Sequence, residues 1–139
     1  MGKRELTKKF IRYHSCLEFV VTPEKHNPEE EFGRIYKFGQ SNSLSPERTL
    51  KVLRCYEEMS SLLLQKIFPS ASSFGALFEY DKAEDTVRVA FSGFSSAEAD
   101  ITSSEVTDTL EYKILSHSIK KIETVCSEET GYDRYLIEL

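Results

Sequence analysis

The segment between Pro46 and Pro69 constrains the fold more than any other part of the sequence. Ser45 is suited to cap a helix and Pro46 to occupy its first position, while Pro69 prevents the helix from continuing. Between them, apolar residues recur at helical steps of three and four, namely Val52, Tyr56, Met59, Leu63 and Ile67. The spacing predicts a helix over Pro46–Phe68. Further leucines widen its apolar stripe, so we expect it to pack against a sheet along most of its length.

Runs rich in β-branched and aromatic residues surround this helix. They predict strands over Cys16–Thr22, Gly75–Tyr80, Thr86–Phe91, Ile122–Ser127 and Tyr132–Leu139. Two shorter helices are predicted over Pro28–Gly39 and Asp108–Lys120, and Ser92–Ser104 is expected to be a loop with room for a short helical turn. This order of elements favours an α+β two-layer sandwich, with a mostly antiparallel sheet and helices on one face.

Composition narrows the classes of protein to which the chain can belong. Its 139 residues contain no linker or repeat, so we expect a single domain over residues 1–139, with residues 1–15 as a flexible or helical basic arm. A formal charge of −5 disfavours a nucleic-acid binder. No apolar run approaches the roughly 20 residues of a membrane span. The cysteines Cys16, Cys55 and Cys126 are too far apart for a metal knuckle or a redox motif, which favours reduced thiols in the cytoplasm.

The second half of the long helix, Glu57–Pro69, reads EEMSSLLLQKIFP. This segment begins with two glutamates, continues with apolar residues and ends in a proline. In these features it resembles the small bacterial anti-sigma-factor serine kinases of the GHKL superfamily. Their helix carries a glutamate four residues before an asparagine that holds magnesium. Four residues are about one helical turn, so both side chains face the same nucleotide. Glu58 matches the glutamate, whereas Leu62 stands at the asparagine position.

Two further stretches match the same family in position but change its contact residues. Residues Val87–Gly93 read VRVAFSG, where the family has a strand ending in D-x-G. Gly93 matches the glycine, but Phe91 replaces the aspartate that accepts a hydrogen bond from the adenine amino group. At the start of the last predicted helix, the family has G-x-G, whose bare backbone approaches phosphate. This chain has Thr109–Glu111, with side chains in that place.

The resemblance implies the histidine kinase-like (Bergerat) ATPase fold, with a vestigial pocket at the positions that correspond to the nucleotide contacts or lie beside them. The vestigial pocket consists of Glu58, Leu62, Gln65, Phe91, Gly93, Thr109 and Glu111. Leu62 offers magnesium no oxygen, Phe91 leaves the adenine amine without an acceptor, and Glu111 places negative charge near the phosphates. We therefore expect no ATP, magnesium or other cofactor. In an active kinase, Glu58 would be the general base.

Three functions remain open at this point. The leading hypothesis is a non-catalytic regulatory protein-binding module, whose partner classes by resemblance are a sigma factor or an anti-sigma antagonist, with a homodimer also implied. Phe94, next to Gly93 in the predicted loop, is the candidate partner contact. The alternative is an ATP-binding serine/threonine protein kinase or ATPase with a diverged pocket, supported by Glu58 and Gly93. The third is an unrelated small α+β adaptor or immunity-type protein.

Overall fold

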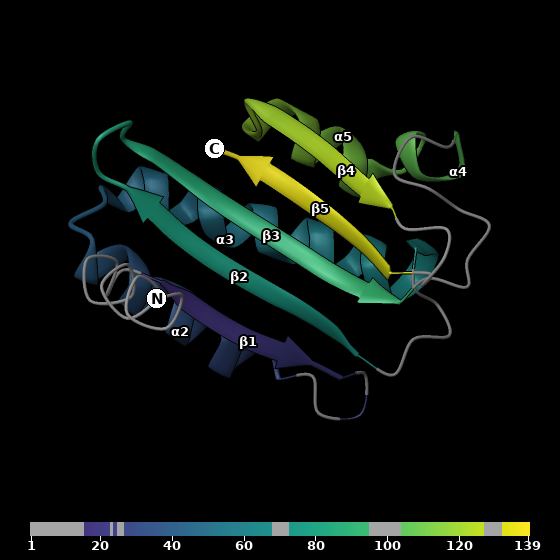
Figure 1. The fold of residues 1–139 in the computed structure, drawn as a ribbon, viewed down its shortest axis with the longest axis horizontal. Helices are drawn as coiled ribbons and strands as arrows, with labels where there is room; N and C mark the ends of the chain where they lie inside the picture. The colour runs from purple at the N-terminus through teal and green to yellow at the C-terminus, as the bar shows by residue number, and fades with distance from the viewer. Residues whose placement is uncertain (1–15, 23, 25–26, 68–72, 95–103, 127–131) are drawn as a thin grey trace, which may run out of the picture.

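The chain forms a five-stranded sheet in which every neighbouring pair of strands is antiparallel. The computed structural model describes residues 16–22, 24, 27–67, 73–94, 104–126 and 132–139. The strands lie side by side in the order β1-β2-β3-β5-β4 (Figure 1). Their bounds are β1 (Leu17–Val21), β2 (Phe74–Asp81), β3 (Thr86–Phe94), β4 (Lys121–Cys126) and β5 (Tyr132–Glu138).

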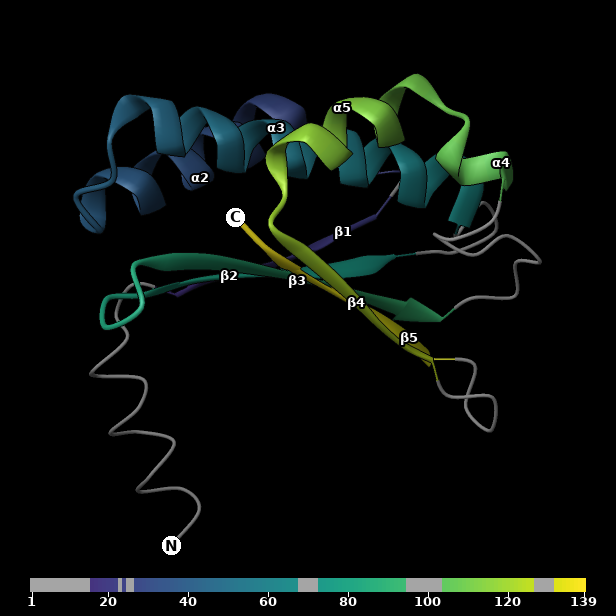
Figure 2. The same ribbon diagram turned by 90° about the horizontal axis from the view of Figure 1, so that it is seen from above.

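The helices lie on one face of this sheet (Figure 2). They are α2 (Pro28–Ser41), α3 (Pro46–Leu62), α4 (Ser104–Thr107) and α5 (Leu110–Ser118), and α3 contacts both α2 and α5. None of the helices in the described ranges is both long and apolar enough to cross a bilayer. The arrangement confirms the predicted α+β two-layer sandwich, with a mostly antiparallel sheet and helices on one face.

Side-chain caps explain where the two long helices begin. The Ser45 hydroxyl accepts a hydrogen bond from the backbone N–H of Arg48 at 3.2 Å, at the start of α3. Asn27 does the same for α2, where its side-chain oxygen accepts from the N–H of Glu30 at 3.3 Å. Each cap satisfies a backbone donor that has no partner within the helix. The cap predicted from the sequence for the long helix, Ser45, is therefore the one that the fold uses.

The predicted long helix does not continue as a regular α-helix to Phe68. After α3, residues Leu63–Ile67 form a π-helical turn, and Phe68 and Pro69 lie outside the described residues. A π turn holds one more residue than an α turn and shifts the positions that follow it. Leu62 and Leu63 are both buried. The predicted end of the helix was wrong because apolar spacing indicates that a segment is helical but does not show the pattern of its backbone hydrogen bonds.

Strand β3 is longer than the sequence predicted. It continues to Phe94, so Gly93 and Phe94 belong to the strand and not to a loop. The last three residues of β3 pair with Arg134, Asp133 and Tyr132 of β5. Ser and Gly have low strand propensity, but a partner strand along the full length of β3 overrides that preference.

Tyr56 lies at the centre of the core between α3 and the sheet. Its ring stacks on Phe91 with the ring centroids 6.2 Å apart, and Phe19 and Phe78 pack around it at 5.4 and 5.8 Å. The Tyr56 hydroxyl donates a hydrogen bond to the buried carboxylate of Glu31. Burial, followed by the hydrogen bond and the charge of Glu31, raises the pKa of this hydroxyl. The phenol therefore keeps the proton that it donates.

Cys55 is buried in the same core, and burial raises the pKa of its thiol from 9.0 to about 12. Above pH 9 the thiol ionises in the unfolded chain while it stays protonated in the folded one. We therefore expect the free energy of unfolding to fall as the pH rises from 9 to 12, with the thiol contributing at most about 1.4 kcal/mol per pH unit. Denaturant unfolding of wild type and Cys55→Ala tests this. The variant should lose stability less steeply, and equal slopes would contradict the assignment.

Candidate functional site

Three positions of the vestigial pocket come together on the helical layer. Glu58, Gln65 and Glu111 line a hollow of about 430 Å³, with further lining from α2 and from the π-helical turn. Phe32 and Leu64 contribute half-buried apolar surface to it. Glu58 belongs to α3, and Gln65 belongs to the π-helical turn that follows it. The contribution of Glu111 depends on the packing of α5 against α3.

Leu62 and Phe91 lie outside this hollow. Both are core residues, with exposed fractions of 1% and 0%. Phe91 packs between Tyr56 and Phe74, with its ring centroid 6.2 and 6.3 Å from theirs. The two residues that stand at the family's magnesium and adenine positions thus fill the space between the layers.

Gly93 and Thr109 each have a structural role in the fold. Gly93 is buried within β3, where it pairs with Asp133 of β5. Thr109 caps α5, since its hydroxyl accepts from the N–H of Tyr112 at 3.2 Å and donates to the carbonyl oxygen of Val106 at 2.6 Å. The helix start that would approach phosphate in the resembled kinases is here closed by its own cap.

Negative charge gathers in the hollow. Burial raises the pKa of the Glu58 carboxyl, and the charges of Glu57 and Glu111 raise it further, whereas Arg54 lowers it. The repulsion between these carboxylates would act equally on a bound phosphate. Among the described residues, no group of three or more histidine, cysteine, aspartate or glutamate side chains is placed to hold a metal ion.

The second candidate surface is the face of the sheet opposite the helices, called the open face below. Strand pairing arranges its side chains in three rows across the sheet. The charged row contains Glu79, Arg88, Glu138 and Lys121; the middle row contains Glu18, Leu77, Ala90, Leu136 and Glu123; the Arg134 row contains Val20, Gly75, Ser92, Arg134 and Val125.

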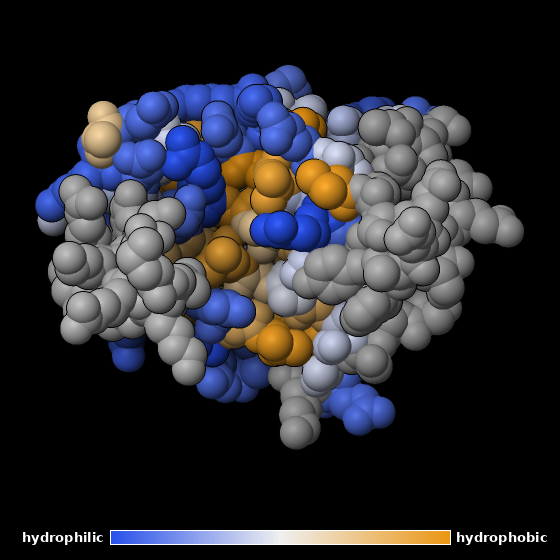
Figure 3. Space-filling model, viewed as in Figure 1, coloured by the Kyte–Doolittle hydropathy of each residue, from blue (hydrophilic) through white to orange (hydrophobic). Residues whose placement is uncertain are grey.

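Apolar side chains occupy the centre of the open face, with hydrophilic residues around them (Figure 3). Leu77, Ala90 and Leu136 are half-buried and help to line a hollow of about 370 Å³. Val20 and Val125, on the two outer strands, are 67% and 53% exposed. An apolar centre with a charged rim is typical of a surface that contacts another protein.

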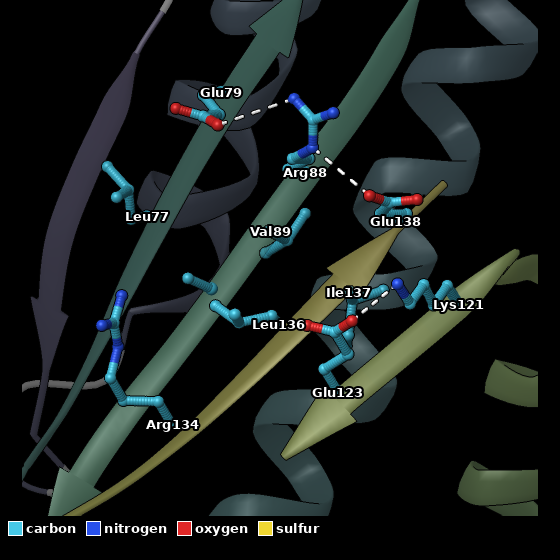
Figure 4. A pocket seen from close by; sticks show the side chains of 11 residues that line it. Leu77, Glu79, Arg88, Val89, Lys121, Glu123, Arg134, Leu136, Ile137 and Glu138 are labelled. Atoms are coloured by element: carbon cyan, nitrogen blue, oxygen red, sulfur yellow. Dashed lines mark hydrogen bonds and ion pairs between the residues drawn. The ribbon is translucent and has the colours of Figure 1, made fainter. Parts of the chain in front are cut away.

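The charges of the open face are unevenly distributed (Figure 4). The Arg88 guanidinium lies 3.0 Å from a carboxylate oxygen of Asp81, 3.4 Å from Glu138 and 4.0 Å from Glu79. One cation thus faces three carboxylates. Arg134 makes no ion pair with another described residue, and its side chain extends from β5 across β3. The charged row itself contains two carboxylates and two cations, and the Arg134 row contains a cation that forms no ion pair with another described residue.

Sequence reasoning missed the open face as a candidate site. The alternation of Arg88 and Ala90 with Val87 and Val89 predicted a buried face and a more polar one. Which residues share a row depends on the pairing of β3 with β5, and no local pattern shows it. Phe94 was the predicted partner contact; its backbone lies in β3, its side chain is outside the described residues, and its role remains a prediction.

Comparison with known proteins finds a similar fold but no matching family. No family model matches the sequence, and no curated protein matches it. One chain in the crystal structure of the SiaB–SiaC complex from Pseudomonas aeruginosa has a similar structure, with a TM-score of 0.65. The similarity covers 99% of this chain and 97% of that chain, at 9% sequence identity. The chain therefore shares its α+β fold with a protein that was crystallised in a two-protein complex.

Proposed function

We propose that this chain is a non-catalytic regulatory module that binds a protein partner and keeps the scaffold of the anti-sigma-factor kinases without their nucleotide site. The observation that carries the proposal is the burial of Leu62 and Phe91, which are 1% and 0% exposed. A nucleotide site at these positions needs an oxygen ligand and a hydrogen-bond acceptor beside an open cavity. Two packed hydrocarbon side chains provide neither.

Two further observations support protein binding. The open face presents an apolar centre with a charged rim, and the similar structure belongs to a protein in a two-protein complex. From the resemblance, the partner is a sigma factor or an anti-sigma antagonist, and the protein acts in the cytoplasm. The acidic hollow beside Glu58 disfavours phosphate and leaves a cationic segment of a partner as the better match.

The alternative is a kinase or ATPase with a diverged pocket. One observation favours it: the pKa of Glu58 is raised, in the direction that suits a general base. Burial and the neighbouring carboxylates Glu57 and Glu111 account for that shift without any catalytic role. The same carboxylates would also repel the triphosphate.

The test is a binding and phosphotransfer experiment with purified sigma factors and anti-sigma antagonists of the source organism. We expect one of them to bind with the same affinity in the presence and absence of magnesium and ATP, with no phosphate transferred. Glu58→Ala should bind equally well. Phosphate transfer that disappears in Glu58→Ala would overturn the proposal and establish the kinase.

A further inference from the structure

We propose that residues 1–15, called the arm below, dock on the open face of their own chain as an amphipathic helix that crosses the strands along the middle row. The arm lies outside the described residues, so its place is inferred from its sequence and from the geometry and charge of the open face. The inference concerns what covers the open face in the free protein. It does not depend on which regulatory partner the protein binds.

The arm carries an apolar stripe at helical spacing. Leu6, Phe10 and Tyr13 are separated by four and three residues, so a helix places all three on one side. Lys3 comes a further three residues before Leu6 and borders the same stripe, while most of the other basic residues lie on the opposite side. A helix with this pattern has one face to bury and one face to leave in water.

The spacing of the stripe matches the spacing of the strands. A helix rises about 1.5 Å per residue, so three or four residues advance about 4.5–6 Å, and neighbouring strands lie about 4.8 Å apart. A helix that crosses the strands therefore presents about one residue of the stripe to each strand. From β1 to β4 the middle row consists of Glu18, Leu77, Ala90, Leu136 and Glu123, which is an apolar centre with a carboxylate at each end.

The point of attachment sets the direction of the arm. The arm ends at Cys16, which precedes β1 at one edge of the sheet. Residues 14–16 span about 10 Å when extended, which is enough to lift a helix onto the face. An arm that runs from β1 towards β4 meets the middle row in a fixed order, with Tyr13 on Leu77, Phe10 on Ala90, Leu6 on Leu136 and Lys3 on Glu123.

The charge of the open face is complementary to that of the arm. The face presents five carboxylates and three cations, namely Glu18, Glu79, Asp81, Glu123 and Glu138 against Arg88, Lys121 and Arg134. Strands β1 and β2, next to the point of attachment, contribute only carboxylates, and Glu18 forms no ion pair with another described residue. The arm has five cations and one carboxylate, so the two surfaces attract each other.

The centre of the open face has room for an aromatic ring. Ala90 lies between Leu77 and Leu136, which border the hollow of about 370 Å³ (Figure 4). Phe10, the central residue of the stripe, falls over Ala90 in the order given above. Because the arm is tethered, its effective concentration at this surface is on the order of millimolar, well above that of most free partners. A regulatory partner that uses the open face must therefore displace the arm.

Tryptophan fluorescence of the full 139-residue chain tests the proposal, because the chain contains no tryptophan of its own. Phe10→Trp places the only indole on the stripe, and Lys8→Trp, the matched control, places it on the opposite side of the helix. We expect acrylamide to quench the indole at position 10 much less than the indole at position 8. The protection should be the same at low and high protein concentration, because the contact lies within one chain.

A second substitution tests where the indole is protected. In the Phe10→Trp chain, Leu136→Asp should weaken docking by about tenfold or more, because a carboxylate replaces the leucine under Leu6. Ala90→Glu, which places a charge under position 10, should act in the same way. Leu110→Asp is the matched control and should leave the protection unchanged, because Leu110 is 70% exposed on α5 in the helical layer. Circular dichroism of each variant shows that the fold is kept.

Three results would overturn the inference: equal quenching at positions 10 and 8, protection that survives both substitutions on the open face, and protection that grows with protein concentration. An unprotected indole at position 10 in a chain that still binds its regulatory partner would leave the proposed function standing. A protected indole in a chain that binds ATP with magnesium would do the reverse.

Discussion

Replacing Phe91 by aspartate, the residue that the resembled kinases carry at this position, should unfold the protein and create no adenine site. The Phe91 side chain is fully buried and packs on Tyr56 and Phe74. The one hydroxyl on these rings, that of Tyr56, already donates to Glu31, so a carboxylate in that place would lack a free hydrogen-bond donor. Burying an unpaired charge costs several kcal/mol in real proteins, which is comparable to the total stability of a small domain.

The milder substitution Phe91→Ala should leave the protein folded, so that its loss in the free energy of unfolding can be measured. Loss of the ring and the cavity it leaves should lower the free energy of unfolding by about 3–5 kcal/mol in a denaturant titration. Ser92→Ala is the matched control, since Ser92 is the next residue of β3 and lies on the open face. Its effect should stay within about 0.5 kcal/mol. A loss below about 1 kcal/mol in Phe91→Ala would show that Phe91 does not fill the core.

The second large effect is expected at the buried pair of Tyr56 and Glu31. One oxygen of Glu31 accepts from the Tyr56 hydroxyl, and the other accepts from the backbone N–H of Asn27 at 3.1 Å. Tyr56→Phe keeps the ring in its stack and removes only the first of these donors. Because Glu31 is only 8% exposed, water cannot fully replace the lost hydrogen bond. We expect a loss of about 1–3 kcal/mol in the free energy of unfolding.

Tyr80→Phe is the control for this pair. The Tyr80 hydroxyl also donates to a carboxylate, that of Asp85 at 2.5 Å, but this contact is exposed to solvent. Water can replace it, so the substitution should change stability by no more than about 0.5 kcal/mol. Equal losses in the two variants would mean that burial does not strengthen the contact between Tyr56 and Glu31.

The layers of the fold could be predicted from local patterns because each element carries its own signal. Ser45, Pro46 and the apolar spacing up to Leu62 determine α3, and β-branched runs mark the strands. The π-helical turn at Leu63–Ile67 could not be predicted, since it keeps the apolar residues of a regular helix. The end of β3 was also misjudged, because its pairing partner lies some forty residues further along the chain in β5.

The candidate site was predictable only in part. Glu58 lies in α3 and Gln65 in the π-helical turn that follows it, so both come from one continuous stretch of chain, whereas Glu111 reaches the hollow through the packing of α5 against α3. Glu31 looked like one of several acidic residues that favour a helix start, and nothing in its surroundings in the sequence pointed to burial beside Tyr56. Leu62 and Phe91 were assigned to a pocket from the resemblance, and the structure places both in the core.

Calorimetric titration with ATP and ADP, with and without magnesium, tests most directly whether the nucleotide site is lost. We expect no detectable heat from wild-type protein that circular dichroism shows to be folded, and the same result from Glu58→Ala. Binding that requires magnesium and weakens in Glu58→Ala would contradict it. The hollow lined by Glu58, Gln65 and Glu111 would then be a working nucleotide site.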